Sequence, residues 1–289
     1  MVATQKVGVS DIRDLLAVNG LRCNVSATLV IAVNLAGKKR KSFTMKKQNQ
    51  TVSFSGGKDS TAMLLMMLEK NEPIHSIIFC DGGWEFPQML DHIDKVEKYV
   101  GMEIVRVSPA VNFTYSLLER KVNPRDKNKE AVYGYGWPSQ MRRWCTREKI
   151  SAIDKYRNTI PNPVACIGMA YDEFLRLNSK ESQKAKYEIR YPLVEYEVTE
   201  ADALEYCYQK GFYWDGLYTK FKRVSCFCCP LQTLGELRKL RKHYPELWNQ
   251  MLEWESIMPE HNFGFKEHKT VHDLEKRFEY EDRQEVLPL

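Results

Sequence analysis

The stretch TVSFSGGKDSTAML, residues 51–64, decides the fold class of this 289-residue chain. An apolar run with strand character leads into two glycines, and an apolar run with helix character follows directly. Consecutive glycines allow positive φ angles and bring successive backbone N–H groups close to an anion. The positive end of the helix dipole adds to that attraction. The stretch therefore predicts a phosphate-binding loop between a strand and a helix.

This loop differs from a Walker A motif, which requires the pattern G-x-x-x-x-G-K-[ST]. Asp59 stands where that motif has Ser or Thr, and Val52 stands where it has its first glycine. Ser55 and Ser60 supply hydroxyl groups, and Lys58 supplies a mobile positive charge. Because Asp59 would repel a bare phosphate, we expect it either to cap the helix or to engage Mg²⁺ together with the phosphates.

Strand-like and helix-like segments alternate after this loop. Short apolar runs lie at 51–54, 75–80, 103–107 and 164–169, and helical stretches lie between them at 60–70 and 87–100. This alternation predicts an α/β fold, a parallel sheet sandwiched by helices. Ligands of such sheets bind beyond the carboxyl ends of the strands, where the glycine-rich loop is expected.

The pattern becomes helical beyond about residue 198. Helices are expected over 199–211 and over 234–255, the second broken before Pro245. We expect three parts: an N-terminal extension of unassigned role (1–44), an α/β nucleotide-binding domain (45–198) and a small helical region that carries cysteines (199–289).

Composition and charge favour a globular protein with an anionic ligand. The chain has 43 Lys and Arg against 38 Asp and Glu, a formal charge of +5, and 43% of its residues are hydrophobic. Nucleotides, tRNA and DNA are all compatible with this mild basicity. The apolar run 27–36 is about half the length that crosses a bilayer, and no signal peptide is evident. We therefore expect a cytoplasmic protein without a membrane partner.

The loop Ser55-Gly56-Gly57-Lys58-Asp59-Ser60 resembles the pyrophosphate-binding (PP) loop of the ATP pyrophosphatase superfamily, in its PAPS reductase-like family. The resemblance implies a Rossmann-like fold of the adenine nucleotide alpha-hydrolase type. It also implies that all six loop residues bind ATP with Mg²⁺ and that ATP is cleaved between its α and β phosphates. Lys58, Asp59 and Asp81 are the catalytic residues that it implies.

Three further segments extend the resemblance. The segment IIFCDGGWEFPQML (77–90) is similar to the second family motif, in which Asp81 and Glu85 are the matching positions. GYGWPSQMRRWCTREK (134–149) resembles a stretch of the sulfur-insertion branch and implies nucleotide or phosphate contacts by Arg143 and Lys149. GMAYDEFLRL (168–177) corresponds to a segment near the nucleotide, with the candidates Asp172, Glu173 and Arg176.

The cysteines indicate a metal or cluster site. Cys226 and Cys229 form a C-x-x-C pair before Pro230, with Cys228 between them. In cluster-bearing relatives a cysteine at the position of Cys145 accompanies such a pair. Three thiolates would hold a [4Fe–4S] cluster, with Cys228 or Cys207 as a fourth ligand or with one open iron. Zinc and free thiols are the alternatives.

Two departures from the family weaken the interpretation as a reductase. PAPS reductases use a cysteine close to the C-terminus, whereas no cysteine follows Cys229 in this sequence. Cluster-bearing APS reductases have Cys-Cys where this chain has Trp144-Cys145. We therefore expect an adenylating ATP pyrophosphatase that activates a substrate for sulfur transfer, near the DNA-phosphorothioation branch.

The alternatives are a sulfonucleotide reductase that releases sulfite and a non-catalytic nucleic-acid or partner-binding module. The acceptor stays open between tRNA, DNA, a sulfonucleotide and a small metabolite. A sulfur-donor or electron-donor protein is a further candidate partner, and the sequence leaves the oligomeric state open.

Overall fold

The computed structural model describes residues 48–123, 128, 130–173, 186–259, 264–266 and 268–286. The chain from Lys46 to Leu289 belongs to one compact unit. The N-terminal extension expected over 1–44 and the candidate Arg176 lie outside the described residues.

Five parallel strands form one sheet in the order β3–β2–β1–β6–β7. The strands are β1 (Asn49–Ser53), β2 (Ile74–Cys80), β3 (Ile104–Val107), β6 (Pro163–Ile167) and β7 (Glu188–Arg190). The chain adds β2 and β3 on one side of β1, and β6 and β7 on the other. The strand order therefore reverses between β1 and β6, and a crevice at the carboxyl ends of the strands is expected at such a switch point.

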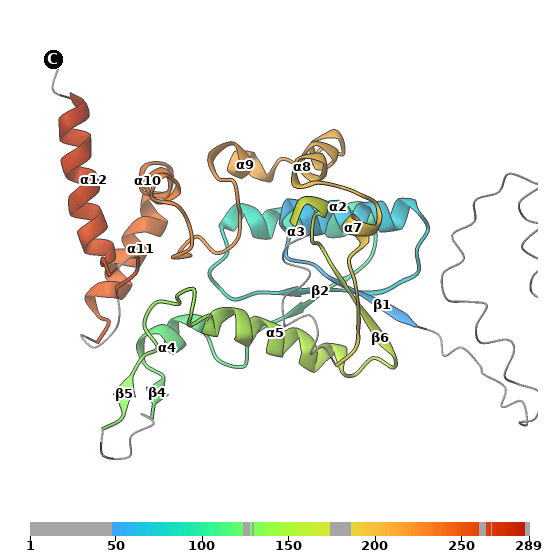
Figure 1. Ribbon diagram of the computed structural model, residues 1–289, viewed down its shortest axis with the longest axis horizontal. Helices are drawn as coiled ribbons and strands as arrows, with labels where there is room; N and C mark the ends of the chain where they lie inside the picture. The colour runs from blue at the N-terminus through green and yellow to red at the C-terminus, as the bar shows by residue number, and fades with distance from the viewer. Residues whose placement is uncertain are drawn as a thin grey trace, which may run out of the picture. The chain divides into compact units, whose positions relative to one another are not determined.

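Helices cover both faces of this sheet, as the sequence predicts. Figure 1 shows α2 (Lys58–Glu69) and α3 (Pro87–Val100) on one face and α5 (Trp144–Arg157) on the other. The helix α8 (Glu200–Gln209) packs against α2. The remaining helices are α4 (Phe113–Leu118), α7 (Pro192–Glu195), α9 (Leu217–Lys220), α10 (Leu234–His243), α11 (Pro245–Ser256) and α12 (Val271–Val286), with the 3₁₀ turns η1 (Tyr171–Glu173) and η3 (Trp214–Gly216).

Local sequence signals set the ends of several helices. Pro87 opens α3, and Gly101 ends it in the left-handed conformation with φ 63°. Capping boxes open α8 at Thr199 and α10 at Thr233. Pro245 opens α11 and separates it from α10, so the break predicted in the helical stretch 234–255 is confirmed.

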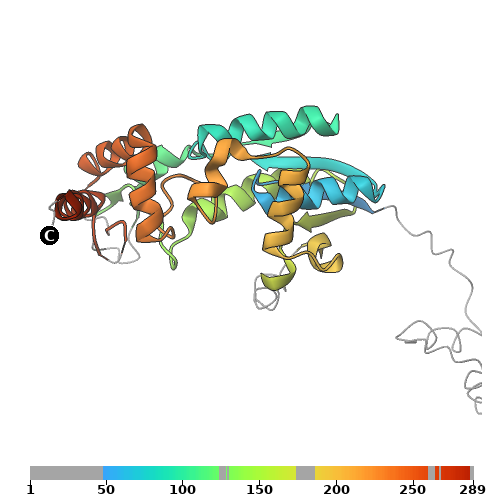
Figure 2. The same cartoon turned by 90° about the horizontal axis from the view of Figure 1, so that it is seen from above.

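An aromatic cluster joins the C-terminal helices to the sheet. Trp84, which follows β2, lies within ring contact of Phe113, Trp144 and Trp254, and Trp137 contacts Trp254 as well. Figure 2 shows α10–α12 beside α4 and the small antiparallel hairpin of β4 (Lys121–Val122) and β5 (Val132–Tyr133). Burial of these large rings holds the helical region against the loop that follows β2.

Candidate functional site

The glycine-rich loop connects β1 to α2 at the switch point of the sheet. Gly56 has φ +77°, and a Cβ there would lie 2.6 Å from Met89 Sδ, so both backbone angle and space require glycine. A Cβ on Gly57 would lie 3.3 Å from the Tyr218 hydroxyl. The two glycines thus allow the backbone of this loop to pass between α3 and the segment around Tyr218.

Ser55 and Ser60 face each other across the loop. Their hydroxyl oxygens lie 3.0 Å apart, the backbone N–H of Ser55 donates to Ser60 Oγ at 3.2 Å, and Ser60 Oγ donates to the Gly57 carbonyl at 3.0 Å. The N–H groups of Asp59 and Ser60 belong to the first turn of α2 and have no acceptor within the helix. Hydroxyls and helix N–H groups thus converge in the way that favours phosphate.

Lys58 is held by two carboxylates. Its side chain is only 7% exposed, and Nζ lies 2.8 Å from Asp59 Oδ1 and 2.9 Å from Glu200 Oε2. A phosphate group that binds Lys58 must therefore compete with these carboxylates or share the ammonium with them.

Asp59 carries a carboxyl group whose pKa is raised. Burial raises the pKa of Asp59, the hydrogen bond and charge of Lys58 oppose that effect, and Glu200 adds to it. A nearby cation would relieve this cost, so the environment of Asp59 fits a role in holding Mg²⁺ beside phosphates. The alternative role as a helix cap is not seen: within the described part of the chain, α2 has Gly57 at its N-cap and no side-chain cap.

The PP loop is contacted by three side chains that the sequence did not mark: Glu200, Trp214 and Tyr218. Besides Glu200 on Lys58, the indole N–H of Trp214 donates to the Gly56 carbonyl at 2.7 Å. The hydroxyl of Tyr218 accepts the Lys58 backbone N–H at 2.8 Å. Sequence reasoning missed all three, because nothing in their local sequence marks contacts made more than 140 positions away.

Gly168 brings β6 against the start of α2. A Cβ at this position would lie 2.9 Å from both Cα and N of Ser60, which are backbone atoms that cannot move aside easily. The close approach of the segment after β6 to the first turn of α2 thus depends on Gly168.

Asp81 follows β2 and orders its own turn. Its Oδ1 accepts the N–H of Gly83 at 2.7 Å, and its N–H donates to the Val107 carbonyl at 2.9 Å. No hydrogen bond or ion pair to the PP loop is found for Asp81 among the residues that the structure describes. Its catalytic role stays a prediction from the family resemblance.

Glu85 lies against Lys149 and Cys226. The Glu85 side chain is 3% exposed and forms an ion pair with Lys149 Nζ. Lys149 Nζ lies 3.6 Å from Cys226 Sγ, and Glu85 Oε1 lies 3.8 Å from that sulfur. Although burial lowers the pKa of Lys149, the charges of Cys226 and Glu85 raise it by more. The segments 77–90 and 134–149 therefore meet at one point with the cysteine-rich loop, residues 226–229.

The backbone reinforces this meeting point. Glu85 and Cys226 form an antiparallel bridge, and the Phe227 N–H donates to the Trp84 carbonyl at 2.9 Å. These bonds fix the cysteine-rich loop to the segment that follows β2.

The four candidate ligand cysteines gather around this loop. Cys145 lies in the first turn of α5, whereas Cys226, Cys228 and Cys229 precede α10. Burial raises the pKa of Cys226, and its neighbours Glu85, Cys229 and Cys145 raise it further while Lys149 lowers it. Burial also raises the pKa of Cys228 and of Cys229.

The thiols converge without forming a complete metal site. Across the described ranges, no three His, Cys, Asp or Glu side chains are arranged so that they could hold a metal ion. The donor set, soft thiols from two segments, nonetheless has the chemistry that an iron–sulfur cluster or zinc requires. Cys207, the other candidate fourth ligand, lies elsewhere, because its Sγ donates to the Lys58 carbonyl at 3.5 Å.

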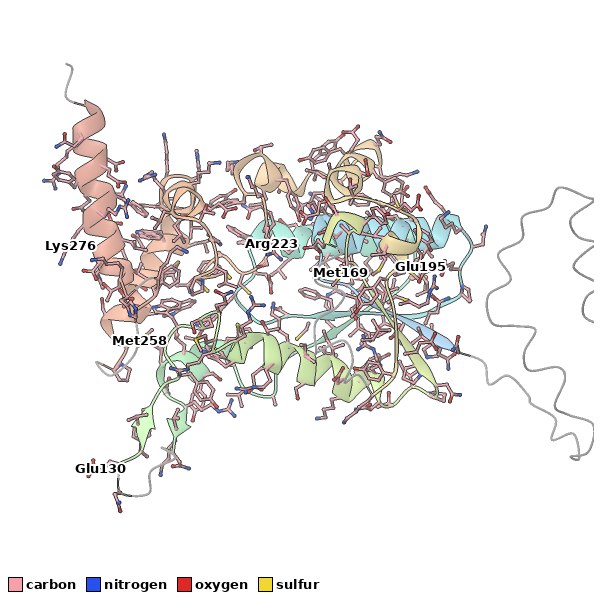
Figure 3. All side chains as sticks on the ribbon, in the orientation of Figure 1. Glu130, Met169, Glu195, Arg223, Met258 and Lys276 are labelled. Carbon is pink, nitrogen blue, oxygen red and sulfur yellow. The ribbon has the colours of Figure 1, made fainter. Side chains whose placement is uncertain are left out.

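Two arginines lie near this group. Arg143 and Arg223 are both exposed, and their charges act against the burial that raises the pKa of Cys229. Arg223 also acts on Asp59 and therefore lies within electrostatic reach of both the PP loop and the thiols. Figure 3 marks Arg223 on the segment between α9 and α10. Arg143 is a candidate from the sequence, whereas Arg223 lies outside every motif that the sequence offers.

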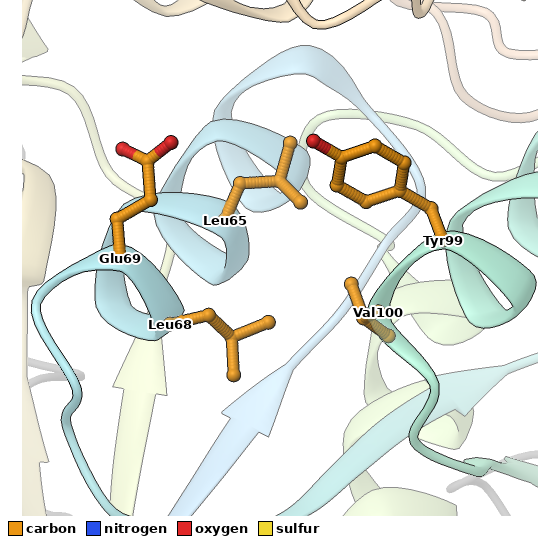
Figure 4. Close-up of a pocket in the computed structure, with 5 residues that line it drawn as sticks. All are labelled: Leu65, Leu68, Glu69, Tyr99 and Val100. Atoms are coloured by element: carbon orange, nitrogen blue, oxygen red, sulfur yellow. The ribbon is translucent and has the colours of Figure 1, made fainter.

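A pocket of about 310 Å³ lies at the other end of α2. Its lining residues are Leu65, Leu68, Glu69, Tyr99 and Val100, contributed by α2 and α3 (Figure 4). The lining contains one carboxylate and no positive charge, so the pocket does not suit a nucleotide phosphate.

Among the described helices, none combines the length and the apolar character that a membrane crossing requires.

The parallel sheet with a glycine-rich loop at its switch point defines an α/β protein of the Rossmann-like class. Residues 49–232 match the phosphoadenosine phosphosulfate reductase domain, and the chain belongs to this family. The match begins at β1 and includes the PP loop and the cysteine-rich loop.

Two curated relatives come from Methanocaldococcus jannaschii. The uncharacterized protein MJ0066 is 29% identical over 230 residues, covering 75% of this chain and 44% of the relative. The uncharacterized protein MJ0973 is 26% identical over 226 residues, covering 76% of this chain and 49% of the relative. The chain thus spans less than half the length of these relatives.

Two solved structures are similar at lower identity. A phosphoadenylyl-sulfate reductase from Candida auris, in a phosphate complex, is 15% identical with a TM-score of 0.42, covering 64% of this chain and 83% of that chain. The U34-tRNA thiolase NcsA from Methanococcus maripaludis, with its [4Fe–4S] cluster, is 17% identical with a TM-score of 0.36, covering 84% of this chain and 74% of that chain.

Proposed function

We propose that this protein binds ATP with Mg²⁺ at the PP loop and cleaves it between the α and β phosphates to adenylate an acceptor, which prepares that acceptor for sulfur transfer. The observation that carries the proposal is the convergence of the Ser55 and Ser60 hydroxyls with the first N–H groups of α2, in the loop that also carries the buried Lys58. This is a donor set for the phosphates of a nucleotide at the switch point of the sheet.

The chain's own residues have separable roles in this proposal. The hydroxyls of Ser55 and Ser60 and the helix N–H groups orient the β and γ phosphates. Lys58, already desolvated, provides positive charge to the leaving pyrophosphate. Asp59 and Asp81 would hold Mg²⁺, which supplies charge neutralisation on the phosphates when bound.

The thiols supply the second part of the proposal. Cys145, Cys226 and Cys229 would hold a [4Fe–4S] cluster, with Cys228 as the fourth candidate and zinc as the alternative metal. Such a cluster would supply an iron able to bind sulfur. Arg143 acts on Cys229, and Arg223 acts on both Cys229 and Asp59. These two positive charges favour an anionic acceptor, and nucleic acid is one candidate. A sulfur-donor or electron-donor protein is a second candidate partner.

The decisive experiment compares products. The protein is purified anaerobically and incubated with ATP, APS or PAPS, each with candidate acceptors and a thiol donor. Formation of AMP and pyrophosphate from ATP, lost in Lys58→Ala and kept in the control Lys210→Ala, supports the proposal. Sulfite released from APS or PAPS without cleavage of ATP would establish the sulfonucleotide reductase instead. ATP binding that Lys58→Ala leaves unchanged would favour the non-catalytic binding module.

Iron and sulfide analysis of the same preparation tests the cluster. Cys145→Ser and Cys229→Ser should lose bound iron, whereas Cys166→Ser, a buried cysteine of β6, should keep it. Stoichiometric zinc without iron in the wild-type protein would show that the site holds zinc and not a cluster. Wild-type protein without either metal would show that the cysteines are free thiols, and only the part of the proposal that concerns the PP loop would remain.

A further inference from the structure

The turn η3, Trp214–Gly216, is the most strained backbone in contact with the PP loop. Trp214 has φ 48°, Asp215 has φ 47° and Gly216 has φ 77°, so three consecutive residues adopt the left-handed region. That region is unfavourable for a bulky side chain such as tryptophan, and such conformations persist where the surrounding contacts hold them. The strain therefore points to a contact that this turn makes.

That contact is the hydrogen bond from the Trp214 indole to the Gly56 carbonyl, 2.7 Å long and buried. The same carbonyl also accepts a longer hydrogen bond, 3.5 Å, from Thr61 Oγ1. In a trans peptide the C=O and the following N–H point in opposite directions. A Gly56 carbonyl held on Trp214 therefore directs the Gly57 N–H to the opposite side, toward Ser55 Oγ at 3.4 Å and into the loop.

The indole itself is fixed by its neighbours. The imidazole of His92 stacks on Trp214 with ring centroids 4.3 Å apart, and His92 Nε2 lies 3.0 Å from Thr61 Oγ1. Tyr218 packs edge-on against the indole at 4.8 Å. Trp214 is 2% exposed and His92 is 1% exposed. These contacts leave the indole N–H a single direction, so its position on Gly56 is built into the fold.

We propose that Trp214 is a positioning residue of the PP loop: by holding the Gly56 carbonyl, it aims the Gly57 N–H at the pyrophosphate portion of the nucleotide. The inference rests on the proposed function for the identity of the anion. In this role Trp214 acts through the Gly56–Gly57 peptide and not on the anion directly. It orients one backbone donor, and it does so from a segment that follows the sheet rather than from the loop.

The test is Trp214→Phe, which keeps an aromatic ring against His92 and removes the indole N–H. Isothermal titration measures binding of inorganic pyrophosphate and of MgATP, and thermal unfolding is recorded in parallel. Loss of one well-directed hydrogen-bond donor should weaken pyrophosphate binding roughly fivefold to tenfold. The matched control is Trp248→Phe, which removes an indole N–H bonded to Glu275 at a site that is also 2% exposed, between α11 and α12.

The control separates positioning from stability. Both variants lose a buried hydrogen bond and should unfold at lower temperature, but only Trp214→Phe should lose affinity for pyrophosphate. Equal affinity of Trp214→Phe and wild type, or an equal loss in Trp248→Phe, would overturn the inference. If Trp214→Phe does not fold, Thr61→Val removes the weaker donor to the same carbonyl, and pyrophosphate affinity should fall about twofold; an unchanged affinity then overturns the inference.

The outcomes also distinguish this inference from the proposed function. Wild-type protein that binds pyrophosphate with the expected dependence on Trp214, but never forms AMP from ATP, supports the positioning role and refutes the adenylation. Wild-type protein that forms AMP while Trp214→Phe binds and reacts normally refutes the positioning role alone. Failure of the wild type to bind either ligand refutes both.

Discussion

Replacing Glu200 by glutamine should lower stability and raise affinity for ATP at the same time. Glu200 Oε2 lies 2.9 Å from Lys58 Nζ, where the lysine side chain is 7% exposed and the glutamate side chain is 40% exposed. Two opposite unit charges at this separation attract by about 6 kcal/mol at an effective dielectric constant of about 20. Because Glu200 is partly in solvent and both charges lose hydration, the net contribution falls to about 1–2 kcal/mol.

The same ion pair competes with phosphate for the ammonium of Lys58. In Glu200→Gln the lysine keeps Asp59 as its partner and loses one competitor, so a phosphate can approach at lower cost. A gain of about 1 kcal/mol corresponds to roughly fivefold tighter binding. The expected result is a melting temperature lower by about 2–6 °C together with a lower dissociation constant for MgATP.

Thermal unfolding without ligand and isothermal titration with MgATP measure the two effects. The control is Glu69→Gln, since Glu69 forms a 2.6 Å ion pair with Lys210 where both side chains are more exposed. That variant should change stability by less than about 0.5 kcal/mol and leave ATP affinity unchanged. Weaker ATP binding by Glu200→Gln would refute the competition, because it would make Glu200 part of the binding machinery.

Three further predictions concern the surroundings of the PP loop. Gly168→Ala should cost about 1–3 kcal/mol of stability and weaken pyrophosphate binding, since its Cβ would press on the Ser60 backbone. The control Gly235→Ala, whose Cβ would meet only Thr233 Oγ1 at an ordinary 3.9 Å, should be neutral or slightly stabilising in the same urea unfolding and titration assays. Tyr218→Phe should weaken pyrophosphate binding by a few-fold in titration. The phenol oxygen accepts a hydrogen bond from the Lys58 N–H, so its own O–H can donate to the pyrophosphate. Unchanged affinity of Tyr218→Phe would contradict this role. Burial lowers the pKa of His92 to about 3, below its value of about 6.5 in the unfolded chain. The stability that neutral His92 contributes is therefore complete above pH ~6.5 and is lost as the pH falls toward 3. The free energy of unfolding should change with pH in this window by up to about 1.4 kcal/mol per pH unit, and this slope should flatten in His92→Phe.

Much of the sheet could be predicted because its strands carry strong local signals. The runs 51–54, 75–80, 103–107 and 164–169 correspond to β1, β2, β3 and β6 within a few residues. Strand β7 was missed because its three residues, Glu188–Arg190, are only partly buried and carry two charges. These residues form a strand because they pair with β6, and their composition does not predict this long-range contact.

The residues of the candidate site also fall into those that the sequence marks and those that it does not. Gly56, Gly57 and Lys58 are recognisable because they are neighbours in one glycine-rich pattern, and Gly56 also needs glycine for its φ of +77°. Glu200, Trp214 and Tyr218 are not, because each acts through a contact with a loop far away in the sequence. Glu85 likewise contacts Lys149 and Cys226, which lie in two other segments, and the spacing of the three segments does not predict these contacts.

The fold class, the family, the PP loop and the presence of a cysteine-rich loop can be predicted from the sequence alone, since each depends on residues that are neighbours along the chain. The fold shows in addition that Lys58 lies between two carboxylates, that Trp214 holds the Gly56 carbonyl and that Cys207 lies apart from the other thiols. The difference arises because backbone conformation and burial periodicity are local properties. The partner of a buried charge or donor is chosen instead by how helices and strands pack, after loops of many residues have closed.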